Sequence, residues 1–377
     1  MPERKTAAVF YRGGTSKAVF FHARDLPQDA HERDQMLLHV LGSPDPYGRQ
    51  LNGLGGGISS LSKAMWVEKS QRNDADIDYT FAQIAIGKPI VDYSANCGNM
   101  SSAVGQFAVE EGIISVPDGD VTVRMYNTNT DICVNSHFQL EDGRAVTQGD
   151  VEIPGVAGAG APVRLEFLDP ARVTGRGLLP TGHAQETIDA PGFGEVPVSI
   201  VDAAACCAIV PAETFGLNGS ESPQEIETKK EVMAALEAIR REAGVRAGLC
   251  ERAEDAPLSA PRTVLVASPS NFTALDGTNY QSQDFDLAVR IVSLGTIHRA
   301  VMVTGAMCLA TATLIEGSVA HGFAHRAIDE NNIRLGNPSG VTVLGASVSR
   351  ENSVWQVHSA SVMRTCRRLM DGHVYHP

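Results

Sequence analysis

Residues 7–27 read AAVFYRGGTSKAVFFHARDLP, and residues 197–217 read PVSIVDAAACCAIVPAETFGL. Each stretch has an apolar run, a turn of small residues and a second apolar run, which is the pattern of two paired β-strands. Each then ends in a related tetrapeptide, ARDL in the first stretch and AETF in the second. The same order of expected elements continues beyond both stretches. The sequence therefore predicts an ancient duplication.

The length of the chain supports the same interpretation, because 377 residues exceed what one hydrophobic core usually organises. We predict an α+β fold with two pseudo-symmetric domains, residues 1–185 and 186–377, and we expect the last strand or tail to pack back on the first. In the first half, helical periodicity predicts helices at 30–41 and from about 100 to 111. In the second half, it predicts a long charged helix at 223–243 and an apolar one at 300–314. The two apolar helices are expected to be buried inside rings of strands.

Composition excludes several classes of function. The formal net charge is −13, which argues against nucleic acid or an anionic membrane as a partner, although a local basic pocket can still bind a small anion. Apolar stretches are too short for a membrane span or a signal peptide. The seven cysteines show no C-x-x-C spacing, so we expect neither disulfides nor a metal site, and a reducing cytoplasmic location.

The duplication makes Cys97 and His298 equivalent, because each lies where a strand leads into an apolar helix. Unpaired N–H groups and the helix dipole make such an end favourable for anions. Two such ends facing one cleft would hold a substrate with two or more carboxylates. We therefore expect the site to lie where the two halves meet.

Cys97 lies in the segment NCGN at 96–99. A thiol beside a helix N-terminus has its thiolate form favoured, and a thiolate can accept a proton or act as a nucleophile. Gly98 would let a ligand approach the backbone, and Asn96 and Asn99 could bind carboxylates. The other six cysteines are interpreted as small apolar residues.

Lys63 ends a glycine-rich segment, GLGGGISSLSK at 53–63. A lysine shielded from water can deliver a proton near neutral pH, whereas most lysines on a strand are solvated charges. His298 could orient the substrate, exchange protons or have a purely structural role. The turn at 13–16 lacks the spacing of a phosphate-binding loop, yet its backbone N–H groups and the Ser16 hydroxyl could bind a carboxylate.

These segments resemble the PrpF family, which includes methylitaconate Δ-isomerase, 2-methylaconitate isomerase and 4-oxalomesaconate tautomerase. The segments that carry the resemblance are RGGTSK at 12–17, GSPD at 42–45, 53–63, NCGN at 96–99, EEG at 110–112, 295–305, PSG at 338–340 and RT at 364–365.

The resemblance implies a diaminopimelate-epimerase-like fold, with each half a β-barrel-like sheet around a central helix. It also implies a cofactor-independent 1,3-allylic proton shift, by double-bond migration or tautomerisation, on an unsaturated di- or tricarboxylate. Its catalytic cysteine and lysine fall on Cys97 and Lys63, its second-half histidine on His298, and its turn serine on Ser16. The full set of expected substrate-binding residues is Ser16, Thr15, Asn52, Gly56, Asn96, Gly98, Asn99, His298, Ser293 and Ser339.

The chain departs from many relatives at three positions. Asn52 replaces an aspartate, Asn337 replaces a histidine, and Ala18 replaces a glycine. The first two changes remove an acidic and a titratable group near the expected cleft. They leave open which unsaturated carboxylic acid is the substrate.

Two other functions stay open at this point. One is a two-base racemase or epimerase of an amino acid, for which His298 is the wrong residue and Cys308 lies deeper in the helix. The other is a non-catalytic accessory protein to an aconitase-like enzyme. The expected partner is a small anionic carboxylate, and a homodimer is compatible with the sequence.

Overall fold

A computed structural model of the chain describes residues 3–93, 96–257, 260–293, 295–325 and 328–377. The chain folds as two compact units, of which unit 1 comprises Met1–Glu166 and Met363–Pro377, and unit 2 comprises Phe167–Val362. Residues 167–185, expected in the first domain, thus belong to unit 2. The C-terminal residues return to unit 1, as the sequence led us to expect.

Unit 1 is built from strands with two α-helices. Its helices are α1 (Ala30–Leu41) and α2 (Ser101–Glu110). Its strands are β1 (Arg4–Gly13), β2 (Ser16–His22), β3 (Lys63–Lys69), β4 (Ile77–Ile84), β5 (Val91–Asp92), β6 (Gly119–Asn127), β7 (Ile132–Glu141), β8 (Arg144–Ala145), β9 (Val151–Glu152), β10 (Ala159–Gly160), β11 (Val163–Leu168) and β23 (Cys366–His376).

Unit 2 repeats this plan with a larger helical layer. Its helices are α3 (Pro223–Thr228), α4 (Lys230–Arg246), α5 (Val303–Thr313) and α6 (Val319–Phe323). Its strands are β12 (Glu186–Ala190), β13 (Gly194–Asp202), β14 (Cys206–Pro211), β15 (Arg262–Ala267), β16 (Phe272–Thr273), β17 (Asn279–Tyr280), β18 (Leu287–Ser293), β19 (Thr296–Ile297), β20 (Ile333–Asn337), β21 (Gly340–Glu351) and β22 (Val354–Arg364).

Strand pairing follows one scheme in both units. In unit 1, β1–β2 is antiparallel, β2–β3 parallel, β3–β4 antiparallel, β4–β6 parallel and β6–β7 antiparallel. In unit 2, the same five relations join β13–β14, β14–β15, β15–β18, β18–β20 and β20–β21. Parallel neighbours need a crossover connection, and in both units a helix lies within each crossover. The duplication and the α+β class are confirmed.

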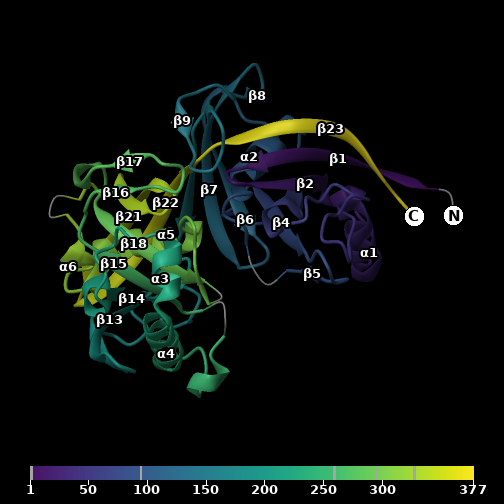
Figure 1. Cartoon of the computed structure of the whole chain (residues 1–377). Coiled ribbons are helices and arrows are strands. Elements are labelled where there is room, and N and C mark those ends of the chain that lie inside the picture. Colours follow the sequence, from purple (N-terminus) through teal and green to yellow (C-terminus); the bar gives the residue numbers. More distant parts are fainter. Residues whose placement is uncertain (1–2, 94–95, 258–259, 294, 326–327) are drawn as a thin grey trace. The chain divides into compact units, whose positions relative to one another are not determined.

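The C-terminal strand completes unit 1. β23 runs antiparallel to β1 from Arg4↔His376 to Gly13↔Cys366, with an irregularity between Phe10 and Tyr11. Figure 1 shows the yellow β23 and the purple β1 side by side along their length. Residues 364 and 365 are thereby brought to the turn at 13–16, since the N–H of Gly14 donates to the carbonyl of Thr365 at 2.9 Å.

Helix α2 is the buried helix of unit 1, as its apolar sequence predicts. Its residues from Ser101 to Ala108 are all buried. Phe107 packs against Phe20 of β2, with 5.3 Å between the ring centroids. A Cβ on Gly105 would lie only 3.0 Å from the Phe138 ring of β7, so the helix and strand pack too closely for a side chain there. Complete burial of one Phe contributes about 1.5–3 kcal/mol.

The charged helix expected at 223–243 is two helices in the structure. The break falls at Lys229, whose backbone has φ −82° and ψ 79°, outside the helical region. Ser222 and Glu225 form a reciprocal cap at the start of α3, which fixes that helix separately. The apolar helix of unit 2, α5, is buried along nearly its whole length, as predicted. No helix in the described ranges is both long and apolar enough to span a membrane.

Candidate active site

Lys63 is the first residue of β3, and its side chain is buried with 7% of its surface exposed. The Lys63 Nζ donates to Gln83 Oε1 at 2.5 Å. Gln83 lies opposite on β4, and its Nε2 donates to the carbonyls of Ser59 and Ser62 at 3.1 and 2.8 Å. Because the amide nitrogen is used by these carbonyls, the amide oxygen is left to face the lysine. Gln83 was not found by sequence reasoning.

Lys63 has an aromatic ring rather than a carboxylate beside its charge. The Nζ lies 4.9 Å from the centroid of the Phe81 ring, within the range of a cation–π contact. Within the part of the chain that the structure describes, no ion pair involves Lys63. Among the described residues, the amine therefore contacts the Gln83 amide oxygen and the Phe81 ring.

Cys97 is a free, half-buried cysteine in the loop before α2. Its carbonyl accepts hydrogen bonds from the backbone N–H of Ser101 at 3.0 Å and from the Ser101 hydroxyl at 3.2 Å. The helix itself begins only at Ser101, so Cys97 precedes it by one turn rather than lying directly at its first residue. The turn formed by residues 98–100 separates the thiol from the helix.

Tyr79 of β4 holds the loop that carries Cys97. Its hydroxyl accepts from Asn96 Nδ2 at 2.9 Å and lies 3.1 Å from the Ser101 hydroxyl. Burial raises the pKa of Tyr79, so this hydroxyl stays neutral. Tyr79 and Phe81 are two residues apart on one strand and share a face. Tyr79, which binds the Cys97 loop, and Phe81, which lies beside the Lys63 amine, are therefore on one face of β4.

The turn at 13–16 meets the Cys97 loop. Asn99 Nδ2 donates to Thr15 Oγ1 at 3.1 Å. Gly14 has φ +48°, and a Cβ built on it would be 2.2 Å from Asn99 Oδ1, so only glycine fits. Ser16 is buried, with 4% of its surface exposed, and begins β2. Of the predicted residues, Asn96 and Asn99 belong to the Cys97 loop itself. Asn96 binds the Tyr79 hydroxyl, and Asn99 binds Thr15 of the turn.

Two arginines beside this turn were missed by the sequence analysis. Arg364 Nε donates to Asn99 Oδ1 at 3.1 Å. Arg12 Nη1 donates to the carbonyl of Gly14 at 3.1 Å and to the carbonyl and hydroxyl of Thr365, both at 3.0 Å. Both arginines lie in segments that carry the family resemblance, RGGTSK and RT, but neither was assigned to the site.

Unit 2 places two of the predicted residues near each other. His298 is half-buried, and its Nδ1 accepts from the backbone N–H of Ala300 at 3.1 Å. The Ser339 hydroxyl donates to the carbonyl of Arg299, the next residue, at 2.6 Å. Ser293 is the last residue of β18, and its side chain lies outside what the structure describes.

Asn52 and Gly56 are held in the long loop between α1 and β3. Asn52 is exposed and lines a cavity of about 610 Å³ with residues 42–47, and neither Lys63 nor Cys97 lines it. A Cβ on Gly56 would lie 2.7 Å from the Leu61 side chain, so tight packing explains this glycine. Neither position has a described contact with the Cys97 loop.

Cys308, the cysteine of the apolar helix in unit 2, does not provide an accessible second thiol. Cys308 is fully buried in α5, and burial raises its pKa well above the usual range. Its sulfur lies 3.3 Å from the carbonyl of Val201. A racemase with matched thiols would need an accessible second cysteine here, so the structure disfavours that alternative. Cys206, Cys207 and Cys366 are buried as well, as expected for small apolar residues.

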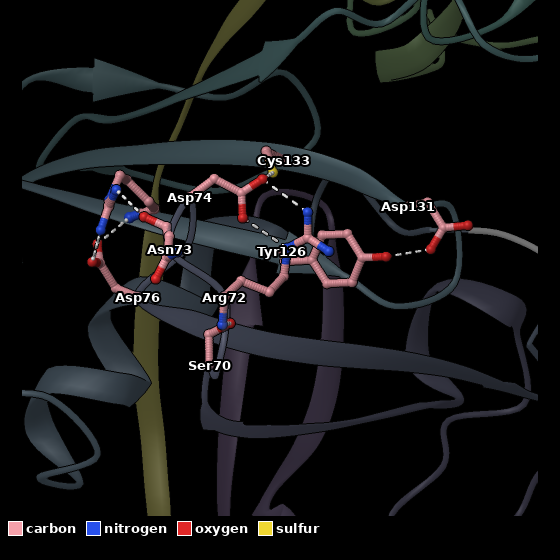
Figure 2. Close-up of polar contacts among 9 residues, drawn as sticks. Ser70, Arg72, Asn73, Asp74, Asp76, Tyr126, Asp131 and Cys133 are labelled. Carbon is pink, nitrogen blue, oxygen red and sulfur yellow. Dashed lines mark hydrogen bonds and ion pairs between the residues drawn. The ribbon is translucent and has the colours of Figure 1, made fainter.

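Cys133 is half-buried and lies in a cluster of paired charges (Figure 2). Its Sγ is 3.9 Å from Asp74 Oδ2, and the same carboxylate takes two hydrogen bonds from Arg72 at 2.8 Å. The Arg72 guanidinium stacks 4.1 Å from the Tyr126 ring centroid. Because Asp74 already pairs with the Arg72 charge, this cluster does not offer an unpaired cation to an anion. Among the described residues, no group of three or more His, Cys, Asp or Glu side chains could hold a metal ion.

Solved structures identify the class of fold. The crystal structure of methylitaconate-delta-isomerase superposes with a TM-score of 0.92 and 34% sequence identity, covering 100% of this chain and 96% of that one. A hydroxyproline epimerase from Agrobacterium vitis superposes with a TM-score of 0.52 at 14% identity, covering 99% and 93%, which shows the fold alone. The epimerase-like fold expected from the sequence is confirmed.

The family follows from sequence comparison. A family model described as PrpF protein matches residues 3–377, and the chain belongs to this family. The 2-methyl-aconitate isomerase of Shewanella oneidensis is 37% identical, covering 100% of this chain and 98% of that protein. The 3-methylitaconate isomerase of Eubacterium barkeri is 34% identical and the 4-oxalomesaconate tautomerase of Pseudomonas putida 33%, each covering 99% and 97%. This chain is therefore an isomerase.

Proposed function

We propose that this isomerase moves a proton between the two ends of an allylic three-carbon unit in a small unsaturated di- or tricarboxylate, using Cys97 and Lys63. One of the two groups removes a proton from the carbon next to the double bond, and the other returns a proton to the far end. The bonding electrons shift along the chain, so the double bond moves and nothing is oxidised or reduced.

The observation that carries this proposal is the arrangement around β4. Lys63 lies over Phe81, and the Cys97 loop is bound to Tyr79, which shares the strand face with Phe81. The Lys63 amine, which has no carboxylate partner among the described residues, contacts one residue of this strand. The loop with the free Cys97 thiol contacts the residue two positions away on the same face. An acid and a base of different chemistry suit a proton shift between two different carbons.

Removing the first proton places negative charge on a substrate carboxylate conjugated to the double bond. Donors fixed beforehand in a site of low dielectric stabilise such charge most strongly. The turn at 13–16 with its buried Ser16, and the loop at 96–99, provide such groups near Cys97. His298, Ser293, Ser339, Asn52 and Gly56 remain predictions as further substrate contacts.

The reaction requires only an acid and a base, which is why we propose that it proceeds without a cofactor. Activity should therefore survive dialysis against a chelator. Its substrates would be anionic acids such as methylaconitates, methylitaconates or oxalomesaconate, which fits the names of the relatives. We also propose a reducing cytoplasmic location, because the cysteines are free.

The test is an assay of the purified chain with a panel of these acids, following the change in conjugation by ultraviolet absorbance. Cys97→Ser and Lys63→Ala should each lower kcat by about 10²–10⁴-fold. The matched controls are Cys133→Ser, at the other half-buried thiol described above, and Lys69→Ala, at the exposed end of the same strand as Lys63. The proposal fails if no acid is isomerised, in which case the accessory-protein alternative gains support.

A further inference from the structure

Arg364 is a buried cation with few partners. Only 6% of its surface is exposed. Its Nε donates to Asn99 Oδ1 at 3.1 Å and its Nη1 to the carbonyl of Met363 at 2.8 Å. A guanidinium has five N–H groups, and these two bonds use two of them. Over the described ranges, Arg364 takes part in no ion pair.

An unpaired buried charge is costly, which is why buried arginines normally face a carboxylate. Arg240 of α4 shows the usual arrangement, since it is equally buried yet bonds both oxygens of Glu237, at 2.7 and 2.9 Å. Burial lowers the pKa of Arg364 to about 10, and Cys97 is the neighbour whose negative charge opposes this effect. Arg364 also donates to Asn99, which follows Cys97 by two residues, so its side chain lies against the loop that carries Cys97.

Two segments distant in sequence from Arg364 hold its side chain in this position. A Cβ on Gly14 would lie 3.2 Å from Arg364 Cδ and 2.2 Å from Asn99 Oδ1, so the glycine turn packs against both residues. Asn99 in turn donates to Thr15 Oγ1 and follows Cys97 by two residues. The guanidinium therefore lies between the turn at 13–16 and the loop at 96–99.

We propose that Arg364 binds a carboxylate of the substrate beside Cys97. A planar guanidinium matches a carboxylate with two parallel N–H···O bonds, and the anion would supply the partner that the folded chain leaves out. This inference rests on the proposed function for the reaction, but the carboxylate preference itself can be measured without turnover. Free acids should bind, whereas the corresponding amides and esters should not.

The experiment uses two small alkylating reagents that differ only in charge. Iodoacetate and iodoacetamide both form an S–C bond at a thiolate and release iodide, but only iodoacetate carries a carboxylate. The rate of alkylation at Cys97 is followed for each reagent by peptide mass spectrometry. Any effect of Arg364 on the thiolate itself acts on both reagents and cancels in the ratio of the two rates. Cys133, whose neighbouring arginine is already paired (Figure 2), provides the internal reference.

In the wild-type chain, we expect the iodoacetate-to-iodoacetamide ratio at Cys97 to exceed that at Cys133 by at least about tenfold. Arg364→Gln should reduce the Cys97 ratio to about the Cys133 value, and Arg364→Lys should keep part of it. Arg240→Gln, at a buried arginine that has a carboxylate partner, should leave both ratios unchanged. Equal ratios at the two cysteines in the wild-type chain would overturn the inference even if Arg364→Gln does not fold.

The outcome separates this inference from the proposed function. If Arg364→Gln lowers the Cys97 ratio while no acid of the panel is isomerised, the carboxylate site stands and the reaction is wrong. If the wild-type chain isomerises an acid but the Cys97 ratio does not depend on Arg364, the reaction stands and this inference is wrong.

Discussion

Replacing Arg364 by Met should leave the stability of the ligand-free protein nearly unchanged, although the residue is almost completely buried. Burial lowers the pKa of Arg364 from its ordinary value to about 10. Because the folded chain holds this proton less tightly than the unfolded chain, the charged form costs about 3 kcal/mol at neutral pH. Its two hydrogen bonds contribute about 1.5 kcal/mol each in the other direction. The net change is therefore expected within about 1 kcal/mol of zero.

Arg240→Met is the matched substitution, because Arg240 is as buried but has its carboxylate partner. Breaking that pair leaves Glu237, which is partly exposed and also bound by Arg241, so we expect a loss of about 2 kcal/mol. For a domain of this size the difference corresponds to roughly 4–8 °C in the thermal midpoint.

The assay is thermal unfolding by circular dichroism without substrate, together with the activity of both variants. Arg364→Met should keep its midpoint and lose activity, whereas Arg240→Met should lose stability and keep its activity at low temperature. A midpoint for Arg364→Met that falls further than that of Arg240→Met would refute the reasoning, because Arg364 would then be a structural brace.

Gln83→Met removes the oxygen that accepts from Lys63 at 2.5 Å while keeping the length of the side chain. We expect kcat to fall by about tenfold and the pH–rate profile to change. An unaltered profile would contradict a positioning role for Gln83. Gly14→Ala places a Cβ 2.2 Å from Asn99 Oδ1 and should abolish most activity, whereas Gly143→Ala, at a positive φ with open space around it, should cost only about 1 kcal/mol of stability from backbone strain and no activity. Equal loss of activity in the two glycine variants would show that backbone strain alone, rather than displacement of Asn99, is responsible.

The sequence alone was sufficient to predict the duplicated fold. Apolar runs, turns and helical periodicity are local patterns, and they correctly placed α1 at Ala30–Leu41. They placed the thiol of Cys97 too close to α2, because the turn at 98–100 has no distinct sequence signal. They also joined α3 and α4, because a single non-helical residue at Lys229 does not interrupt the pattern of charges.

The supporting residues of the site could not be predicted, because they are defined by long-range contacts. Arg364 and Asn99 are 265 positions apart and meet only because the C-terminal strand pairs with β1. Gln83 is one polar residue in a strand of alternating polar and apolar residues. Such a pattern does not show whether the glutamine amide binds a lysine or faces water. Cys97 was predicted from its position before a helix and Lys63 from the resemblance to the PrpF family, and their role as acid and base is a prediction.

The most direct test of that role is proton exchange in deuterated buffer, followed by NMR on the wild-type chain, Cys97→Ser and Lys63→Ala. If one group removes the proton and the other returns it, the variant that keeps the base should put deuterium into unreacted substrate, while the variant without the base should put in none. Isomerisation by either variant within about tenfold of the wild-type rate would contradict the assignment of Cys97 and Lys63 as the acid and base.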